Sequence, residues 1–106
     1  MSQENNWEQI CPKYEGAIQI LGKRWTGLII DVLLRGASRF KEIRESVPHM
    51  SDKILSERLK ELEEQEILVR RVYSETPVRI EYELTEKGKE LRPVIESIHE
   101  WGQKWM

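Results

Sequence analysis

Apolar residues in the first third of the chain recur at the spacing of amphipathic helices. The segment 12–21 begins with Pro12, a residue suited to the first turn of a helix. The segment 25–35 repeats its apolar residues at i, i+3, i+4, i+7 and i+8, and Gly36 follows as a natural helix end. The pattern therefore predicts two helices in succession.

Two more helices are predicted on either side of a short turn. Residues 39–46 form the first helix, and residues 51–65 form the second, with Ser51 as its N-cap. Pro48 disfavours a helical conformation of the residue before it, so 47–50 is expected to be the turn. The apolar side of the second helix is a narrow stripe of leucines, Leu55, Leu59 and Leu62.

The hydrophobic period then changes from that of helices to that of strands. Residues 78–84 alternate apolar and charged side chains, which predicts a half-buried strand. Residues 67–73 are rich in β-branched and apolar side chains, and they are expected to pair with this strand around a turn at 74–77. The sequence therefore predicts a β-hairpin directly after the fourth helix.

A last helix is predicted over 86–105, with Thr85 as its cap and a kink or break near Pro93. Trp101 and Trp105 lie four residues apart and so share one face of this helix. Two large rings at the end of a small domain favour contact with a partner surface, where tryptophan is common. The alternative is that they fold back onto the core of the monomer. The residues expected at a dimer interface are Trp7, Ile95, Ile98, Trp101 and Trp105.

The order of these elements predicts the fold class. A mainly helical chain with a helix-turn-helix over about 39–65, a hairpin over about 67–84 and a terminal helix over about 86–105 is typical of a winged helix-turn-helix. We expect it to dimerise through its terminal helices. The 106 residues, of which 39% are apolar, are enough for a single ordered domain over 1–106.

The exposed side of the 51–65 helix carries candidate DNA-binding residues. With the leucine stripe turned inward, the outward positions are Lys53, Ser56, Glu57 and Lys60, flanked by Arg58. Lysine and serine donors suit phosphates and base edges, and Glu57 is suited to accept from a cytosine amino group. Arg79 lies near the hairpin tip, where a wing reaches phosphate or the minor groove. The full predicted contact set is Arg39, Ser51, Lys53, Ser56, Glu57, Arg58, Lys60 and Arg79.

Local charge favours this interpretation more than the charge of the whole chain does. Seventeen Lys and Arg residues against 19 Asp and Glu residues give a net charge of −2, which excludes a strongly basic nucleic-acid-binding protein. Residues 35–60 are nevertheless net basic, whereas 61–66 contain four glutamates. The N-terminal part of one helix therefore suits DNA and its C-terminal part does not. Two alternatives are an ordinary solvated face and a winged helix used for protein contact without DNA.

Short motifs follow one another along the chain in a specific order. They are Cys11-Pro12, Gly22-Lys23-Arg24-Trp25, Arg39-Phe40 with Glu42-Ile43, Met50-Ser51-Asp52-Lys53 with Leu55, Leu59 and Leu62, the stretch from Pro77 to Thr85, and Gly88, Leu91 and Trp101. In this order and spacing they resemble the HxlR-type family of small winged helix-turn-helix regulators, which are MarR-like, over nearly all of residues 11–101. Two positions depart from the family pattern, because Glu66 and His49 stand where glycine is frequent.

The resemblance implies a homodimeric transcriptional regulator, either a repressor or an activator, with double-stranded DNA as its partner. Its two-fold symmetry implies a palindromic operator. The resemblance also implies that Lys53, Ser56 and Lys60 lie on the DNA-facing helix and that Arg79 lies in the wing. Several members of the family sense electrophiles or oxidants through an N-terminal cysteine, and Cys11 sits in the matching position.

Cys11 is the only cysteine of the chain, which excludes an intrachain disulfide. It precedes Pro12 at a predicted helix start, where the helix dipole and Lys13 would favour the thiolate. One interpretation is therefore a redox or electrophile sensor. The other is a packed, inert cysteine that acts as a small apolar residue. A regulator that responds to a small-molecule effector without redox chemistry is a further alternative.

Enzymatic, metal-binding and membrane functions are not expected. His49 and His99 have no partner at the spacing of metal ligands, and the chain lacks a P-loop and a Gly-x-Ser-x-Gly element. We therefore expect no catalysis and no cofactor. The most apolar stretch, 27–34, is far shorter than the roughly 18 residues that span a bilayer. The first residues also lack an apolar signal core, so we expect a cytoplasmic protein.

Overall fold

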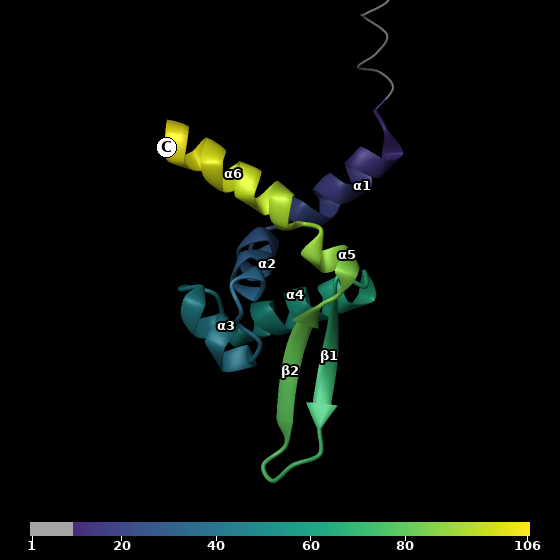
Figure 1. Cartoon of the computed structure of the whole chain (residues 1–106), viewed down its shortest axis with the longest axis vertical. Coiled ribbons are helices and arrows are strands. Elements are labelled where there is room, and N and C mark those ends of the chain that lie inside the picture. The colour runs from purple at the N-terminus through teal and green to yellow at the C-terminus, as the bar shows by residue number, and fades with distance from the viewer. Residues whose placement is uncertain (1–9) are drawn as a thin grey trace, which may run out of the picture.

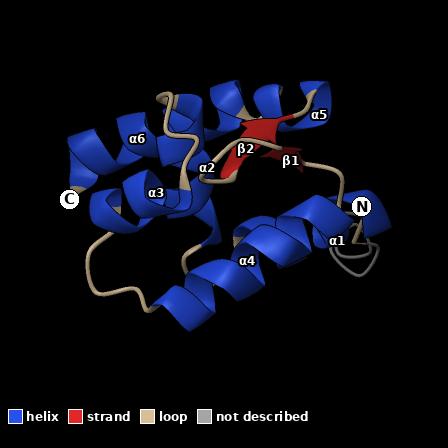
Figure 2. Cartoon of the chain, turned by 90° about the horizontal axis from the view of Figure 1, so that it is seen from below, coloured by secondary structure: helices blue, strands red, loops and turns tan. Residues whose placement is uncertain are grey.

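The computed structural model describes residues 10–106, which form six helices and one two-stranded sheet. In chain order the elements are α1 (Pro12–Leu21), α2 (Thr26–Leu34), α3 (Phe40–Ser46), α4 (Asp52–Glu64), β1 (Leu68–Tyr73), β2 (Arg79–Leu84), α5 (Glu86–Lys89) and α6 (Arg92–Trp105). The hairpin projects from one end of the body formed by α2, α3 and α4, while α1 and α6 diverge at the other end (Figure 1). Figure 2 looks onto the hairpin end, where α3 and α4 lie. The predicted winged helix-turn-helix is confirmed.

Apolar side chains from most elements meet around α4. Its predicted leucine stripe is buried, with each of the three side chains at most 2% exposed. The stripe shares one core with buried residues of α2, α3, both strands and α6: Ile29, Ile30, Leu33, Ile43, Leu68, Leu84 and Ile95. Burying one such side chain stabilises a fold by about 1.5–3 kcal/mol. This burial decides which side of α4 faces solvent.

The turn between α3 and α4 forms where the sequence predicts it. Val47 ends α3, and Ser51 caps α4 by accepting a hydrogen bond from the backbone N–H of Ile54 at 3.1 Å. Between them, the backbone passes through a left-handed conformation at His49, where φ is 69°. The predicted N-cap and the predicted turn are therefore both confirmed.

The hairpin is anchored at its base. Leu68 of β1 and Leu84 of β2 pair in register and are buried. Toward the tip, Val72 and Val78 are 55% and 60% exposed, because the strands run past the helical body. The prediction of a half-buried second strand is thus confirmed for β2, whereas Val78, which was predicted as part of it, lies before the strand and is exposed.

The single helix predicted over 86–105 is in fact two helices. Thr85 caps α5 as predicted, since its Oγ1 accepts a hydrogen bond from the backbone N–H of Gly88 at 3.1 Å. Pro93 lies in the first turn of α6, where its missing N–H leaves no helical hydrogen bond unmade. The break expected near Pro93 is therefore confirmed, and the chain restarts as a new helix.

Helix α6 contributes one buried side chain to the core, that of Ile95. Ile98, Trp101 and Trp105 are 59%, 61% and 65% exposed. The alternative that the tryptophans fold back onto the core of the monomer is therefore wrong. Ile95, which was expected at a dimer interface, packs inside the chain instead, because it faces α2 across the first turns of α6. Trp7 lies outside the described residues.

The two departures from the glycine pattern both adopt left-handed backbone. The φ angle is 60° at Glu66, directly after the C-cap of α4, and 69° at His49. A side chain strains this conformation by roughly 1–2 kcal/mol, whereas glycine adopts it freely. The chain therefore keeps a backbone shape that suits glycine and accepts the strain.

Replacing Glu66 by glycine should relieve that strain. We expect Glu66→Gly to raise the free energy of unfolding in urea by about 1 kcal/mol. Glu63→Gly, inside the last turn of α4, is the matched control and should lower it by about 1 kcal/mol. A Glu66→Gly protein that is no more stable than the wild type would contradict the strain argument.

Candidate nucleic-acid interface

The side of α4 opposite the leucine stripe faces solvent at the hairpin end of the molecule. The four residues predicted on this face, Lys53, Ser56, Glu57 and Lys60, are all exposed. Within the described part of the chain, no ion pair joins Lys53 or Lys60 to another residue. The helix therefore presents two lysine cations and a serine hydroxyl that are available to phosphate and to base edges.

Two further predicted residues lie where the helices of the helix-turn-helix begin. Ser51 directly precedes α4, and Arg39 directly precedes α3. The Arg39 guanidinium is about half exposed, and its Nε lies 3.7 Å from Oε2 of Glu81 in β2. Arg44 of α3 also pairs with Asp52 in the first turn of α4, with 3.2 Å between Nε and Oδ1. These pairs connect α3 both to the hairpin and to α4.

Glu42 fixes the start of α3. Its Oε1 accepts hydrogen bonds from the backbone N–H groups of Ser38 and Arg39, each at 2.9 Å. These bonds lower the pKa of Glu42 from its ordinary value, because they favour the charged carboxylate. The carboxylate thereby holds the backbone of Arg39 in place at the edge of the interface.

The arginine predicted in the wing is bonded within the hairpin. Arg79 Nη2 lies 2.9 Å from Oε2 of Glu75, Nη1 pairs with Glu81, and the guanidinium lies over the ring of Tyr73. The hydrogen bonds to Glu75 and then to Glu81 raise the pKa of Arg79 further above its ordinary value. Arg79 therefore lies near the hairpin tip as predicted, with its guanidinium already paired to two carboxylates. Sequence spacing does not indicate these partners, because the shape of the hairpin tip brings them together.

Arg58 lies beside the exposed face as predicted, but its guanidinium is bonded within the protein and is not open to solvent. Its side chain is 12% exposed, and its Nε donates to the backbone carbonyl of Arg24 at 3.0 Å. Its Nη1 lies 3.5 Å from Oε2 of Glu61. Arg24 precedes Arg58 by 34 residues, so no local pattern could have indicated this contact.

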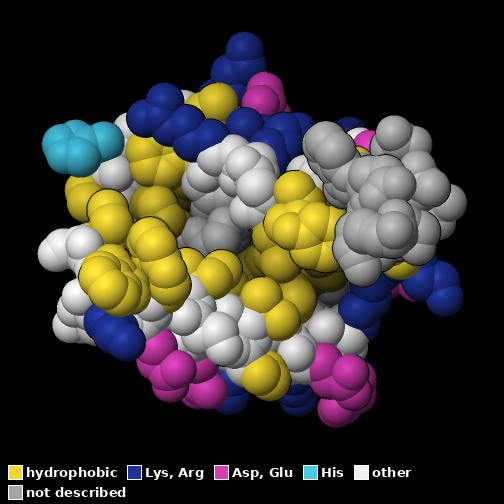
Figure 3. Space-filling view, turned by 90° about the horizontal axis from the view of Figure 1, so that it is seen from above, with side chains coloured by type: hydrophobic (Ala, Val, Ile, Leu, Met, Phe, Trp, Pro, Cys, Tyr) yellow, Lys and Arg dark blue, Asp and Glu magenta, His cyan; other side chains and the backbone are white. Residues whose placement is uncertain are grey.

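The opposite end of the molecule gathers exposed apolar side chains (Figure 3). We call this group the terminal apolar surface; its residues are Ile10, Tyr14, Ile18, Leu28, Val94, Ile98, Trp101, Trp105 and Met106. Next to Ile10, Cys11 occupies the N-cap of α1 and is exposed. The alternative of a cysteine packed inside the chain is therefore wrong.

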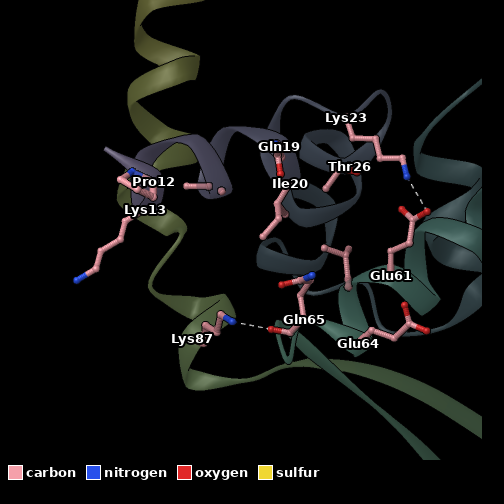
Figure 4. A pocket seen from close by; sticks show the side chains of 13 residues that line it. Pro12, Lys13, Gln19, Ile20, Lys23, Thr26, Glu61, Glu64, Gln65 and Lys87 are labelled. Carbon is pink, nitrogen blue, oxygen red and sulfur yellow. Dashed lines mark hydrogen bonds and ion pairs between the residues drawn. The ribbon is translucent and has the colours of Figure 1, made fainter. Parts of the chain in front are cut away.

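A groove of about 790 Å³ lies between α1 and the C-terminal end of α4 (Figure 4). Ile20 of α1 points into the groove. Two lysines at the edges of the groove bond to α4 and to Gln65, the residue that follows α4. Lys23 Nζ lies 2.8 Å from Oε2 of Glu61, and Lys87 Nζ donates to the backbone carbonyl of Gln65 at 2.7 Å. These bonds tie the α1–α2 turn and α5 to the end of α4.

Within residues 10–106, no three His, Cys, Asp or Glu side chains are grouped so that they could hold a metal ion. His99 Nε2 instead lies 3.0 Å from Oδ2 of Asp31, which joins α6 to α2. Over the same residues, no helix combines the length and hydrophobicity that a membrane span requires.

A family model described as an HxlR-like helix-turn-helix matches residues 20–106. Among relatives, the chain is 50% identical over 101 residues to an uncharacterized HTH-type transcriptional regulator, YvaP of Bacillus subtilis, covering 95% of this chain and 94% of that protein. It is 53% identical over 96 residues to the HTH-type transcriptional regulator YodB of the same organism, covering 91% of this chain and 86% of that protein.

Solved structures agree with this similarity. The reduced form of YodB has a TM-score of 0.81 at 52% identity and covers 92% of this chain and 95% of its own. YodB has also been solved after diamide treatment and with bound quinone. The redox regulator HypR in its reduced form has a TM-score of 0.81 at 34% identity, covering 87% of this chain and 91% of the HypR chain.

The Glu42 carboxylate should stabilise the protein only while it is charged. Because its folded-state pKa is lowered, its contribution is present above the unfolded-state pKa and is lost as the pH falls through the folded-state value. We expect Glu42→Ala to lower the free energy of unfolding near neutral pH, and to lower it less below about pH 3. Glu45→Ala, an exposed control on the same helix, should have little effect at either pH. An equal loss for Glu42→Ala at both pH values would contradict the role of its charge.

Proposed function

The chain belongs to the HxlR-like helix-turn-helix family of transcriptional regulators, and we propose that it binds a palindromic DNA operator as a homodimer. The observation that carries the proposal is the exposed polar face of α4, backed by the buried leucine stripe and flanked by a projecting hairpin. A helix with an apolar back and exposed donors suits the major groove.

The proposed DNA contacts begin at the N-terminal end of α4. Lys53, Ser56 and Lys60 serve as donors to phosphates and base edges, and Glu57 accepts from a base amino group. Arg39 and Ser51, at the starts of α3 and α4, contact the phosphate backbone of the DNA. Arg58 and Arg79 are bonded inside the protein, so we assign them no direct phosphate contact.

The proposed dimer forms through the terminal apolar surface. A monomer rarely exposes so many large apolar side chains in one region without a partner. Tryptophan is enriched at interfaces because its ring buries a large area at a low cost in conformational entropy. A second copy of the chain would cover this surface through a two-fold axis. The two copies of α4 would then face half-sites about 34–36 Å apart.

We also propose that Cys11 responds to oxidants or electrophiles. Its thiol is exposed at the start of α1, beside the terminal apolar surface. YodB, a relative of similar length, is known in reduced, diamide-treated and quinone-bound forms. With one cysteine per chain, the available products are a disulfide between the two Cys11 residues of a dimer, a mixed disulfide with a small thiol, a sulfenic acid or an electrophile adduct.

Fluorescence anisotropy on duplex DNA from upstream of the protein's own and neighbouring genes tests the DNA proposal. We expect salt-sensitive binding that prefers this duplex over a scrambled one by about 10³-fold or more. Lys53→Met and Lys60→Met should each reduce the slope of log affinity against log salt by about 1. Lys89→Met, which removes an exposed lysine from α5, is the control and should leave the slope unchanged. No binding at low salt would favour the protein-contact alternative.

Analytical ultracentrifugation at micromolar concentration tests the dimer. The wild type should sediment as a dimer, and the double variant Trp101→Ser with Trp105→Ser as a monomer, because two anchors of the proposed interface are removed. Gln103→Ser, an exposed polar residue on the same helix, is the control and should remain dimeric. A wild type that is monomeric under these conditions would contradict the proposal.

A further inference from the structure

The turn between α1 and α2 is joined to α4 by two side chains of α4, Arg58 and Glu61. Arg58 Nε donates to the backbone carbonyl of Arg24 at 3.0 Å. Oε2 of Glu61 lies 2.8 Å from Lys23 Nζ and 3.5 Å from Arg58 Nη1. Oε2 of Glu61 therefore pairs with one cation of the turn, Lys23, and with one of α4, Arg58 (the Lys23 pair is drawn in Figure 4).

Arg58 is the main residue of this link. Its side chain is 12% exposed, whereas those of Lys23 and Glu61 are 47% and 39% exposed. An ion pair in solvent contributes little, but a charged donor shielded from water forms a strong and geometrically specific hydrogen bond. The guanidinium also satisfies two partners at once, because its N–H groups have fixed directions.

The turn that Arg58 contacts has a defined shape. Trp25 adopts a left-handed backbone with φ of 78°, and the Arg24 guanidinium lies 4.6 Å from the centre of the Trp25 ring. The backbone N–H of Thr26 donates to the carbonyl of Lys23 at 3.2 Å, and the Thr26 residue is buried. These contacts define the path of the chain from the end of α1 to the start of α2.

That preceding helix, α1, is otherwise held to the body mainly at its last turn. None of its side chains is fully buried, Ile20 and Leu21 pack partly buried against the core, and the groove of about 790 Å³ separates the rest of the helix from the end of α4 and from α5. The position of α1 relative to α4 therefore depends strongly on the turn and on the link at its end. At the opposite end of α1 from this link, Cys11 is the N-cap of the helix.

We propose that Arg58 is a positioning residue that ties α4 to the α1–α2 turn and so couples the orientation of α1 to that of the exposed face of α4. The coupling reaches that face directly, because Arg58 lies between Glu57 and Leu59, and its Nη1 is 3.9 Å from Oε1 of Glu57. This inference rests on the proposed function in taking α4 as the DNA-facing helix and Cys11 as the responsive residue. The inference adds the physical route by which a change at Cys11 reaches α4.

Amide hydrogen exchange without DNA tests the link separately from DNA binding. N-ethylmaleimide supplies the change at α1: the Cys11 sulfur bonds to one alkene carbon, and the thiol proton is transferred to the neighbouring carbon. Because the chain has one cysteine, no other thiol reacts. The proteins compared are the wild type, Arg58→Met and Arg35→Met. The last removes the C-cap arginine of α2, which pairs with Asp31 of the same helix.

We expect alkylation to accelerate exchange across residues 52–64 of the wild type and of Arg35→Met at least threefold. Arg58→Met should exchange in this segment about tenfold faster than the wild type before alkylation, with no further change afterwards. The proposal is overturned if alkylation leaves the wild-type segment unchanged, or if Arg58→Met keeps the response. If Arg58→Met does not fold, Glu61→Gln takes its place, since it keeps the side-chain shape and weakens both ion pairs; it must show a reduced response.

Salt-dependent DNA binding distinguishes positioning from direct contact. Arg58→Met should bind duplex DNA at least tenfold more weakly than the wild type with an unchanged salt slope, because the proposed phosphate contacts remain. A slope reduced by about 1 would make Arg58 a phosphate contact and overturn the proposal, as would an unchanged affinity. If the wild type itself binds no DNA, the proposed function fails, while hydrogen exchange still decides whether the link exists.

Discussion

The burial of one side of α4 is the constraint on which the rest of the structure depends. Three leucines at helical spacing enter a core shared by α2, α3, both strands and α6. Because their burial fixes the rotation of the helix about its axis, it also decides which polar residues reach solvent. The capped turn before α4 and the base of the hairpin after it then set where that exposed face lies. The exposed polar face of α4 is thus a consequence of core packing.

The cations around α4 divide into two kinds by their bonding. Arg58 and Arg79 each hold several groups of the protein, which suits the fixed fork of N–H groups in a guanidinium. Lys53 and Lys60 have no ion-pair partner in the described part of the chain. A basic segment therefore contains both the residues that shape the surface and the residues that remain open to an anion. Counting charges along the sequence cannot separate the two.

The two ends of the molecule differ in how they are held. The hairpin end is braced by bonds between α3, α4 and β2, whereas α1 has no fully buried side chain and α6 has one. Large apolar side chains are left exposed on both terminal helices because too few elements lie beyond them to cover that surface. Polar bonds such as the link through Arg58 consequently become important in relating the terminal helices to the body.

Local rules were sufficient for the elements themselves. Periodicity placed the leucine stripe, Ser51 and Thr85 carried the caps expected of them, and Pro93 marked a real break between helices, since each depends on neighbours along the chain. The tertiary structure decided the partners of Arg58 and Arg79, the burial of Ile95 and the exposure of the hairpin tip. Arg58 finds its acceptor 34 residues away, Arg79 depends on the shape of a turn, and the exposure of Val72 depends on where the helical body ends. Sequence spacing encodes the faces of a helix or strand, but the packing of elements determines what each face meets.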